Sequence, residues 1–125
     1  MAIQQKTLPA TIAAGQALSN AILVGDFTLC GIYIPSGWTG TGAITWQTSF
    51  DGGNTFVEVN DSTGAAVSLP TATAASTYYA LDLRNPSLAG LVLVKIRSGT
   101  VGTPVNQASQ MVVQVVTRRF NPAGP

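Results

Sequence analysis

The sequence predicts an all-β fold, a single-domain antiparallel β-sandwich or jelly roll, and three observations support this class. Short stretches rich in Val, Ile, Thr and aromatic residues recur at intervals of about 8 to 15 residues, separated by Gly, Pro and Asn. One stretch, Ile44 to Phe50, alternates larger and polar residues as a half-buried strand does, with Trp46 and Phe50 on its core face. No segment shows a helical period bounded by helix caps.

The first strands are the weakest in the pattern. Residues 7–13 and 18–24 form two expected strands that turn at Ala14-Gly15. After an interruption at Gly25-Asp26, an apolar stretch continues to Ile34 and is closed by Pro35-Ser36-Gly37, because glycine and proline favour turn geometry. The residues before these strands, about 1–8, are expected to form an extended N-terminal arm that is free to add a strand to a partner.

The stretch Asp51-Gly52-Gly53-Asn54 lies between the expected strands 44–50 and 56–59. Its two oxygen-bearing side chains raise the possibility of calcium. Calcium takes six to eight oxygen ligands, however, and the loop lacks the spaced Asp and Asn residues of a calcium loop. Glycine and asparagine accept the positive φ angles of tight hairpin connections. We therefore interpret this stretch as a bend.

The C-terminal half is expected to add three strands. Residues 78–83 are short and aromatic, 91–97 carry alternating Val and Ile, and 110–118 form the last long strand. Residues 65–77 are low in complexity and are expected to form a loop. Residues 120–125 are expected to form a short C-terminal tail.

The composition indicates one domain that works within an assembly. A chain of 125 residues and 12.9 kDa buries about two thirds of its surface on folding, which is enough for a core without disulfides. Charged residues make up only 9% of the chain, against about 25% in typical domains, and the net charge is +1. Such a surface repels copies of itself weakly, so we expect self-association, with a homotrimer as the expected form.

The single cysteine, Cys30, excludes an intramolecular disulfide and is expected to be a buried free thiol. The N-terminal residues show no basic region followed by an apolar one, and no run of 18 apolar residues occurs. We therefore expect no signal peptide and no membrane partner, with synthesis in a cytoplasm.

The residue types present argue against an enzyme. Histidine is absent, which removes the commonest general base and zinc ligand, and one cysteine is too few for a thiolate metal cluster. A paired-carboxylate glycosidase would need Glu58 and Asp82 to meet in a pocket that the sequence does not indicate. We expect no catalytic residues, no metal and no cofactor. The five carboxylates are Asp26, Asp51, Glu58, Asp61 and Asp82.

The basic side chains are too few to indicate a nucleic-acid surface. We interpret them as a solvated sheet face and expect no specific nucleic-acid binding. The residues concerned are Lys95, Arg97, Arg118 and Arg119.

Trp38 is the candidate contact residue for a partner. It lies in the loop Ser36-Gly37-Trp38-Thr39-Gly40, where an exposed indole would suit a neighbouring subunit or a sugar. The alternative is that Trp38 folds back over its own sandwich. Trp46, by contrast, alternates with core residues and is expected to be buried.

Three stretches resemble small virion structural proteins of tailed bacteriophages and prophages. They are IPSGWTGTGAITWQTSFDGGNTFVEV (residues 34–59), YYALDL (78–83) and LVLVKIRSGTVGTPVNQAS (91–109), followed by a Val-rich strand ending in Thr-Arg-Arg. The resemblance extends from about Ala21 to Arg119. It implies a part of a virion. The hairpin and the V-K-I-R strand also have a looser likeness to discoidin-type and carbohydrate-binding jelly rolls, which concerns the fold and not the function.

From this resemblance and the composition, we expect a capsid decoration or cement protein that binds the assembled head and stabilises it. Its partners would be the major capsid protein or other virion proteins, and its location the virion. The alternative is a receptor- or glycan-binding module of a phage tail, neck or fibre. Binding of Trp38 to a glycan would favour the alternative.

Overall fold

The computed structural model describes the backbone of residues 2–81, 88 and 91–121 and the side chains of residues 5–81, 88 and 91–119. Within these residues the chain forms eight β-strands and no α-helix. The strands are β1 (Ala2–Ile12), β2 (Ile22–Leu23), β3 (Thr28–Ile34), β4 (Ile44–Thr48), β5 (Val57–Glu58), β6 (Thr77–Ala80), β7 (Leu93–Ser98) and β8 (Met111–Asn121).

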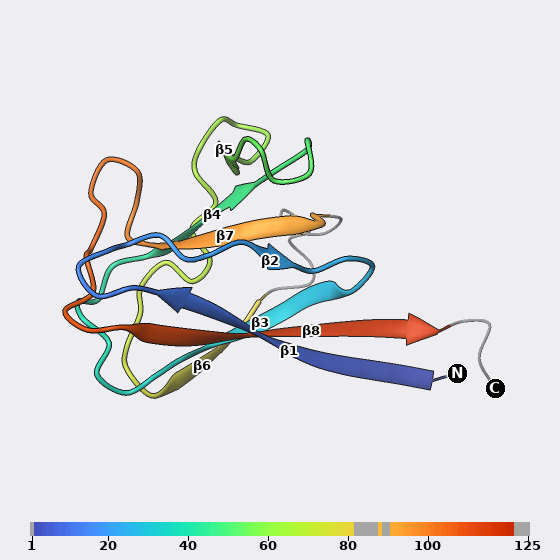
Figure 1. Cartoon of the computed structure of the whole chain (residues 1–125), viewed down its shortest axis with the longest axis horizontal. Helices are drawn as coiled ribbons and strands as arrows, with labels where there is room; N and C mark the ends of the chain where they lie inside the picture. The colour runs from blue at the N-terminus through green and yellow to red at the C-terminus, as the bar shows by residue number, and fades with distance from the viewer. Residues whose placement is uncertain (1, 82–87, 89–90, 122–125) are drawn as a thin grey trace.

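The described strands form two four-stranded antiparallel sheets, with the orders β1-β8-β3-β6 and β2-β7-β4-β5. The predicted antiparallel β-sandwich is therefore confirmed. The strands pair as β1 with β8, β2 with β7, β3 with β6 and β4 with β5, as if one long hairpin were folded over on itself. Figure 1 shows the two sheets as layers, with β1 and β8 in one and β7 and β4 in the other.

The core lies between the two sheets and is built from the inward-facing residues, which alternate with outward-facing residues along each strand. Its side chains are large, apolar and fully buried, as expected for the inner faces of a sandwich. Trp46 is also fully buried, as predicted, and its indole N–H donates a hydrogen bond to the carbonyl oxygen of Leu69 at 3.1 Å. The centre of the core contains Ile32, Ile34, Val113 and Val115 from one sheet and Ile44, Trp46, Val94 and Ile96 from the other.

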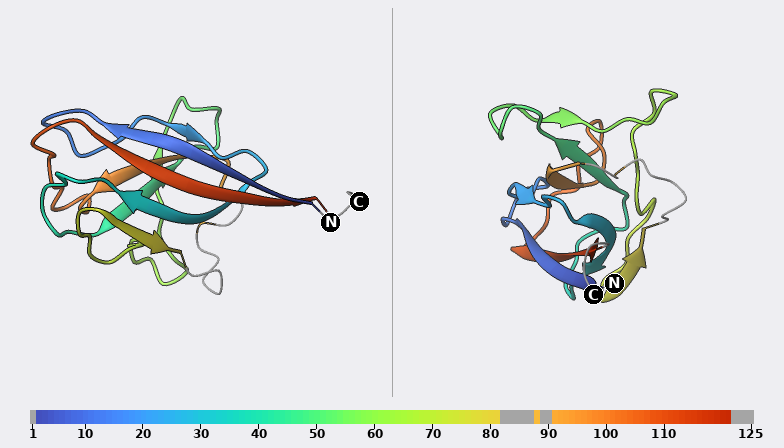
Figure 2. Two further views of the ribbon diagram at one scale, coloured as in Figure 1. Left: turned by 90° about the horizontal axis from the view of Figure 1, so that it is seen from below. Right: turned by 90° about the vertical axis from the view of Figure 1, so that its right-hand side faces the viewer.

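The N-terminal segment differs from the prediction of a free arm. β1 pairs with β8 along its whole length, from Ala2 opposite Asn121 to Ile12 opposite Met111. The reason is that β8 continues to Asn121, three residues past the predicted end, and supplies backbone partners for the residues before Thr7. β3 pairs with β8 only as far as Arg118, so β1 and β8 continue as a two-stranded ribbon that projects from the sandwich (Figures 1 and 2).

The other predicted strands are present with shifted ends. Of the expected strand 18–24, only Ile22–Leu23 forms a strand, and Leu18 adds an isolated bridge to Arg97. The strand predicted at 78–83 is Thr77–Ala80; residues 82 and 83 lie outside the described part of the chain, as do tail residues 122–125.

Cys30 interrupts the pairing of β3 with β8. The register shifts between Leu29 and Gly31, so Cys30 is the extra residue of a β-bulge. Because a bulge residue leaves the alternation of inward and outward side chains, Cys30 is half-buried and not buried as predicted. Its thiol donates a hydrogen bond to the carbonyl oxygen of Thr28 at 3.4 Å.

Candidate interaction surfaces

Trp38, the predicted contact residue, is buried in its own sandwich and only 8% exposed. Its indole N–H donates to the hydroxyl of Thr73 at 3.0 Å, and that hydroxyl donates to the carbonyl oxygen of Gly42 at 2.9 Å. The loop turns back at Gly37, whose φ of 82° is readily adopted only by glycine. The interpretation of Trp38 as an exposed partner contact is therefore corrected in favour of the alternative, packing against its own chain.

The stretch Asp51-Gly52-Gly53-Asn54 is a bend, as predicted. Gly52 and Gly53 have φ angles of 75° and 99°. One oxygen of Asp51 accepts hydrogen bonds from the hydroxyl of Ser49 at 2.8 Å and from the N–H of Thr55 at 2.9 Å. These bonds, with the Thr55 N–H as the largest cause, lower the pKa of Asp51. The carboxylate is thus used to close the turn.

We predict that Asp51→Ala and Asn54→Ala lower the melting temperature slightly, because each removes only local hydrogen bonds of an exposed turn. Gly53→Val is expected to cost more, about 2 kcal/mol, since a valine is strained at positive φ. A Cβ at Gly53 would also lie 3.2 Å from the side chain of Leu93. Thermal unfolding measures these effects. Calcium titration by calorimetry should give no saturable heat, and a tight isotherm lost in Asp51→Ala would contradict the bend interpretation.

The remaining described carboxylates also have partners in their own chain. Asp61 accepts hydrogen bonds from the N–H groups of Thr63 and Ala65 at 2.9 and 3.1 Å, which closes another turn. Asp26 forms an ion pair with Arg119 at 2.7 Å. Asp82 lies outside the described residues, so its distance from Glu58 is not defined. Within the described residues, no group of three or more Cys, Asp or Glu side chains is close enough to hold a metal ion.

Glu58 and Arg97 form a bidentate ion pair on the outer face of the second sheet. Arg97 donates from Nη1 to Oε1 of Glu58 at 2.5 Å and from Nη2 to Oε2 at 2.8 Å. Gln47, between them in the sheet, donates to Glu58 at 2.6 Å. The hydrogen bonds from Arg97 are the largest cause that lowers the pKa of Glu58. They likewise raise the pKa of Arg97.

The basic residues therefore do not form the solvated face that the sequence predicts. The side chain of Arg97 is only 9% exposed. Lys95 lies over the ring of Phe56, with its nitrogen 4.4 Å from the ring centre, and Arg119 is paired with Asp26. Of Lys95, Arg97, Arg118 and Arg119, only Arg118 is exposed.

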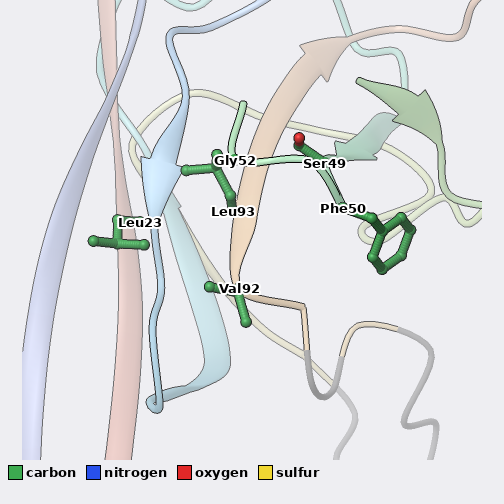
Figure 3. Close-up of a pocket in the computed structure, with 6 residues that line it drawn as sticks. All are labelled: Leu23, Ser49, Phe50, Gly52, Val92 and Leu93. Atoms are coloured by element: carbon green, nitrogen blue, oxygen red, sulfur yellow. The ribbon is translucent and has the colours of Figure 1, made fainter. Parts of the chain in front are cut away.

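An exposed apolar pocket of about 550 Å³ lies at one end of the second sheet (Figure 3). Leu23, Phe50 and Val92 border it and are 63%, 83% and 51% exposed. Antiparallel pairing places Leu23 opposite Leu93, which joins β2 and β7 in one wall. Clusters of exposed apolar side chains often mark interaction sites. The pocket is lined by Leu23, Ser49, Phe50, Gly52, Val92 and Leu93.

The alternating pattern of the sequence predicted that two of these exposed residues, Phe50 and Val92, would face the core. It placed Phe50 on the face of Trp46 and Val92 on the face of Val94. β4 ends at Thr48, however, and β7 begins at Leu93, so Phe50 and Val92 lie in turns where the two-residue period no longer applies. An aromatic residue next to the turn signal Asp-Gly-Gly was the one available indication in the sequence.

The outer face of the first sheet carries two exposed tyrosines. Tyr33 in β3 lies directly opposite Tyr78 in β6, and they are 39% and 49% exposed. The hydroxyl of Tyr78 lies over Gly31, where any larger side chain would collide with it. The bare glycine thus lets the tyrosine ring lie flat against the sheet.

A solved structure shares the fold of this chain. No family model matches the chain, and no curated protein matches it. A solved structure, the crystal structure of the SPBc2 prophage-derived protein YomS, matches with a TM-score of 0.54 at 15% sequence identity. The match covers 95% of this chain and 96% of that one, so the two share the same β-sandwich fold over most of their lengths. Among the described residues, none belongs to a helix long and apolar enough to cross a membrane.

Proposed function

We propose that this chain is a structural protein of a bacteriophage or prophage virion, which decorates the capsid, binds the assembled head and stabilises it. The observation that carries the proposal is the exposed apolar pocket of Leu23, Phe50 and Val92 on a chain with only 9% charged residues. The fold likeness to a prophage-derived protein supports the phage origin. The partner is then the major capsid protein or another virion protein, and the protein is made in the host cytoplasm.

The apolar pocket takes the role that Trp38 was expected to play. Burying a Leu, Val or Phe side chain contributes about 1.5 to 3 kcal/mol, so three such residues contribute several kcal/mol. Association costs about 4 to 15 kcal/mol in lost freedom of motion. One copy alone is therefore a weak binder. Several linked copies that bind neighbouring sites of a shell gain avidity, which makes self-association part of the proposal.

The stabilisation works by mass action. A protein that binds the assembled shell, and not its separated subunits, lowers the free energy of the shell at every filled site. Because the contact is apolar and the net charge is +1, moderate salt is expected to change attachment very little.

We predict that heads of the encoding phage that lack this protein rupture at a lower temperature, and that adding the purified protein restores them. Phe50→Ser is expected to restore them poorly, because it removes the largest exposed apolar side chain of the pocket. Val101→Ser is the matched control, since Val101 is a 66% exposed apolar residue that does not line the pocket. Heat-induced DNA release measures the effect. Heads that are equally heat-stable with and without the protein would contradict the cement function.

The alternative, a receptor- or glycan-binding module of a tail, neck or fibre, now depends on different residues. Both tryptophans are buried, and a sugar ring would instead stack on the exposed, directly opposed pair Tyr33 and Tyr78. Glycan-array binding that is lost in Tyr33→Ala, with no attachment to heads, would favour this alternative over decoration.

A further inference from the structure

β1 is an edge strand with a free side over much of its length. The order β1-β8-β3-β6 places it at one end of its sheet, and it is 11 residues long. Gln5, Lys6, Thr7 and Pro9 are exposed, and Leu8 is half-buried. A long exposed edge presents unpaired N–H and C=O groups to which another strand can bind.

Hydrogen bonds at Thr11 show which main-chain groups of β1 point away from β8. The N–H of Thr11 donates to the side-chain oxygen of Asn20 at 2.7 Å, and its carbonyl oxygen accepts from the N–H of Asn20 at 3.2 Å. Since β8 lies on one side of β1, Asn20 must lie on the other. Main-chain groups alternate between the two sides of a strand, so those of Gln5 and Thr7 also point to the free side.

Pro9 fits the same assignment. The main-chain groups of Pro9 point to the same side of β1 as those of Thr11, Thr7 and Gln5. Proline has no N–H to donate. A proline is tolerated in a sheet where its missing N–H faces away from the neighbouring strand. Within the described residues, no hydrogen bond reaches the outward main-chain groups of Gln5 or Thr7. Asn20 thus closes one end of the edge, and the part before Pro9 is open.

We propose that β1 pairs with β1 of a second copy, antiparallel and around a two-fold axis at Gln5. In this register Gln5 faces Gln5 of the other copy, and Thr7 faces Ile3. The outward groups of these three residues then exchange about six hydrogen bonds between the copies. The two sheets become one continuous sheet across the dimer, which is β-strand addition between identical chains.

The sequence of β1 suits a second copy of the chain. In the register around Gln5, the missing N–H of Pro9 falls outside the pairs formed by Ile3, Gln5 and Thr7 in both copies. Lys6, the one charged residue of β1, faces residue 4 and not the other Lys6, which avoids directly opposed like charges. The nitrogen of Lys6 also lies 5.7 Å from the ring centre of Phe27 in its own chain.

This pairing does not rest on the proposed function, because it needs no shell and uses a surface separate from the apolar pocket. A two-fold contact produces a dimer, or an even-numbered assembly if a second contact is added. The oligomeric state proposed here therefore differs from the homotrimer expected from the composition. That expectation was based on the charge content alone.

The double variant Gln5→Pro/Thr7→Pro tests the pairing. It removes two outward N–H donors and leaves the hydrogen bonds between β1 and β8 in place, as Pro9 already does. Gln5→Thr/Thr7→Val is the matched control, since it changes the same side chains and keeps both N–H groups. Sedimentation equilibrium at micromolar concentration should show twice 12.9 kDa for the wild type and the control, and 12.9 kDa for the proline variant with an unchanged β spectrum.

Cross-linking provides a second measurement that does not depend on proline. In a Cys30→Ser background, Gln5→Cys should form a dimer with a short thiol cross-linker, because opposed residues lie about 5.5 Å apart between Cα atoms. Ser62→Cys, in an exposed turn, should give no cross-linked dimer and should run as a single chain under denaturing conditions. A wild-type monomer, or oligomers that persist in the proline variant and do not cross-link at residue 5, would overturn the pairing.

Discussion

Trp38→Ala is expected to lower the free energy of unfolding by about 3 to 5 kcal/mol, as large-to-small substitutions of buried aromatic residues do. The substitution leaves a cavity beside the core and removes the N–H that binds the hydroxyl of Thr73 at 3.0 Å. Trp38→Phe is the matched variant. It keeps a ring but loses the hydrogen bond, so its cost is expected to be smaller, about 1 to 2 kcal/mol.

Urea unfolding of the wild type and both variants measures these differences. The result distinguishes a core residue from a contact residue. If Trp38→Ala unfolds like the wild type but no longer attaches to heads, the burial of Trp38 is wrong and the earlier interpretation of an exposed contact is right.

Glu58→Ala is expected to destabilise the protein by about 2 to 3 kcal/mol, because it leaves the charge of Arg97 buried without its carboxylate partner. This value lies below the usual range of about 3 to 5 kcal/mol for a buried ion pair, because the side chain of Glu58 is 31% exposed, while that of Arg97 is only 9% exposed. The double variant Glu58→Leu/Arg97→Met removes both charges and is expected to recover much of the loss. Double-mutant analysis of urea unfolding gives the coupling between the two residues.

The same ion pair makes stability depend on pH in the acid range. The folded-state pKa of Glu58 is lowered from 4.5, so its stabilisation is complete above that value and is lost as the pH falls through the folded-state pKa. The wild type should therefore lose more stability than Glu58→Ala between pH 7 and acid pH. Parallel curves for the two proteins would show that the ion pair contributes nothing. Asp26, Asp51 and Asp61, whose pKa values are also lowered, add an acid slope common to both proteins.

If Trp38→Ala and Glu58→Ala both destabilise the protein as expected, Trp38 and Arg97 are excluded as contacts for a partner. Trp38 and Arg97 then belong to the folded body of the sandwich. The apolar pocket, the tyrosine pair and the free edge of β1 remain as separate surfaces. Phe50→Ser, Tyr33→Ala and Gln5→Pro/Thr7→Pro each change one of them, so the three functions proposed for these surfaces are tested independently.

Local patterns in the sequence determined the fold class and the bend at 51–54. The alternation around Trp46 needs only the two-residue period of a strand, and the preference of Gly52 and Gly53 for positive φ is a property of the residues themselves. These signals act over a few residues, and no distant partner has to be known. Both features are therefore present in the structure as the sequence predicted them.

Only the tertiary structure decided where the functional candidates point. Trp38 is buried because Thr73, 35 residues away, receives its N–H, and Arg97 is buried because Glu58, 39 residues away, binds it. Phe50 is exposed because β4 ends two residues earlier. The N-terminal segment is a paired strand because β8, at the other end of the chain, lies beside it. Each outcome depends on which distant segments meet, and a local pattern of residues carries no information about that.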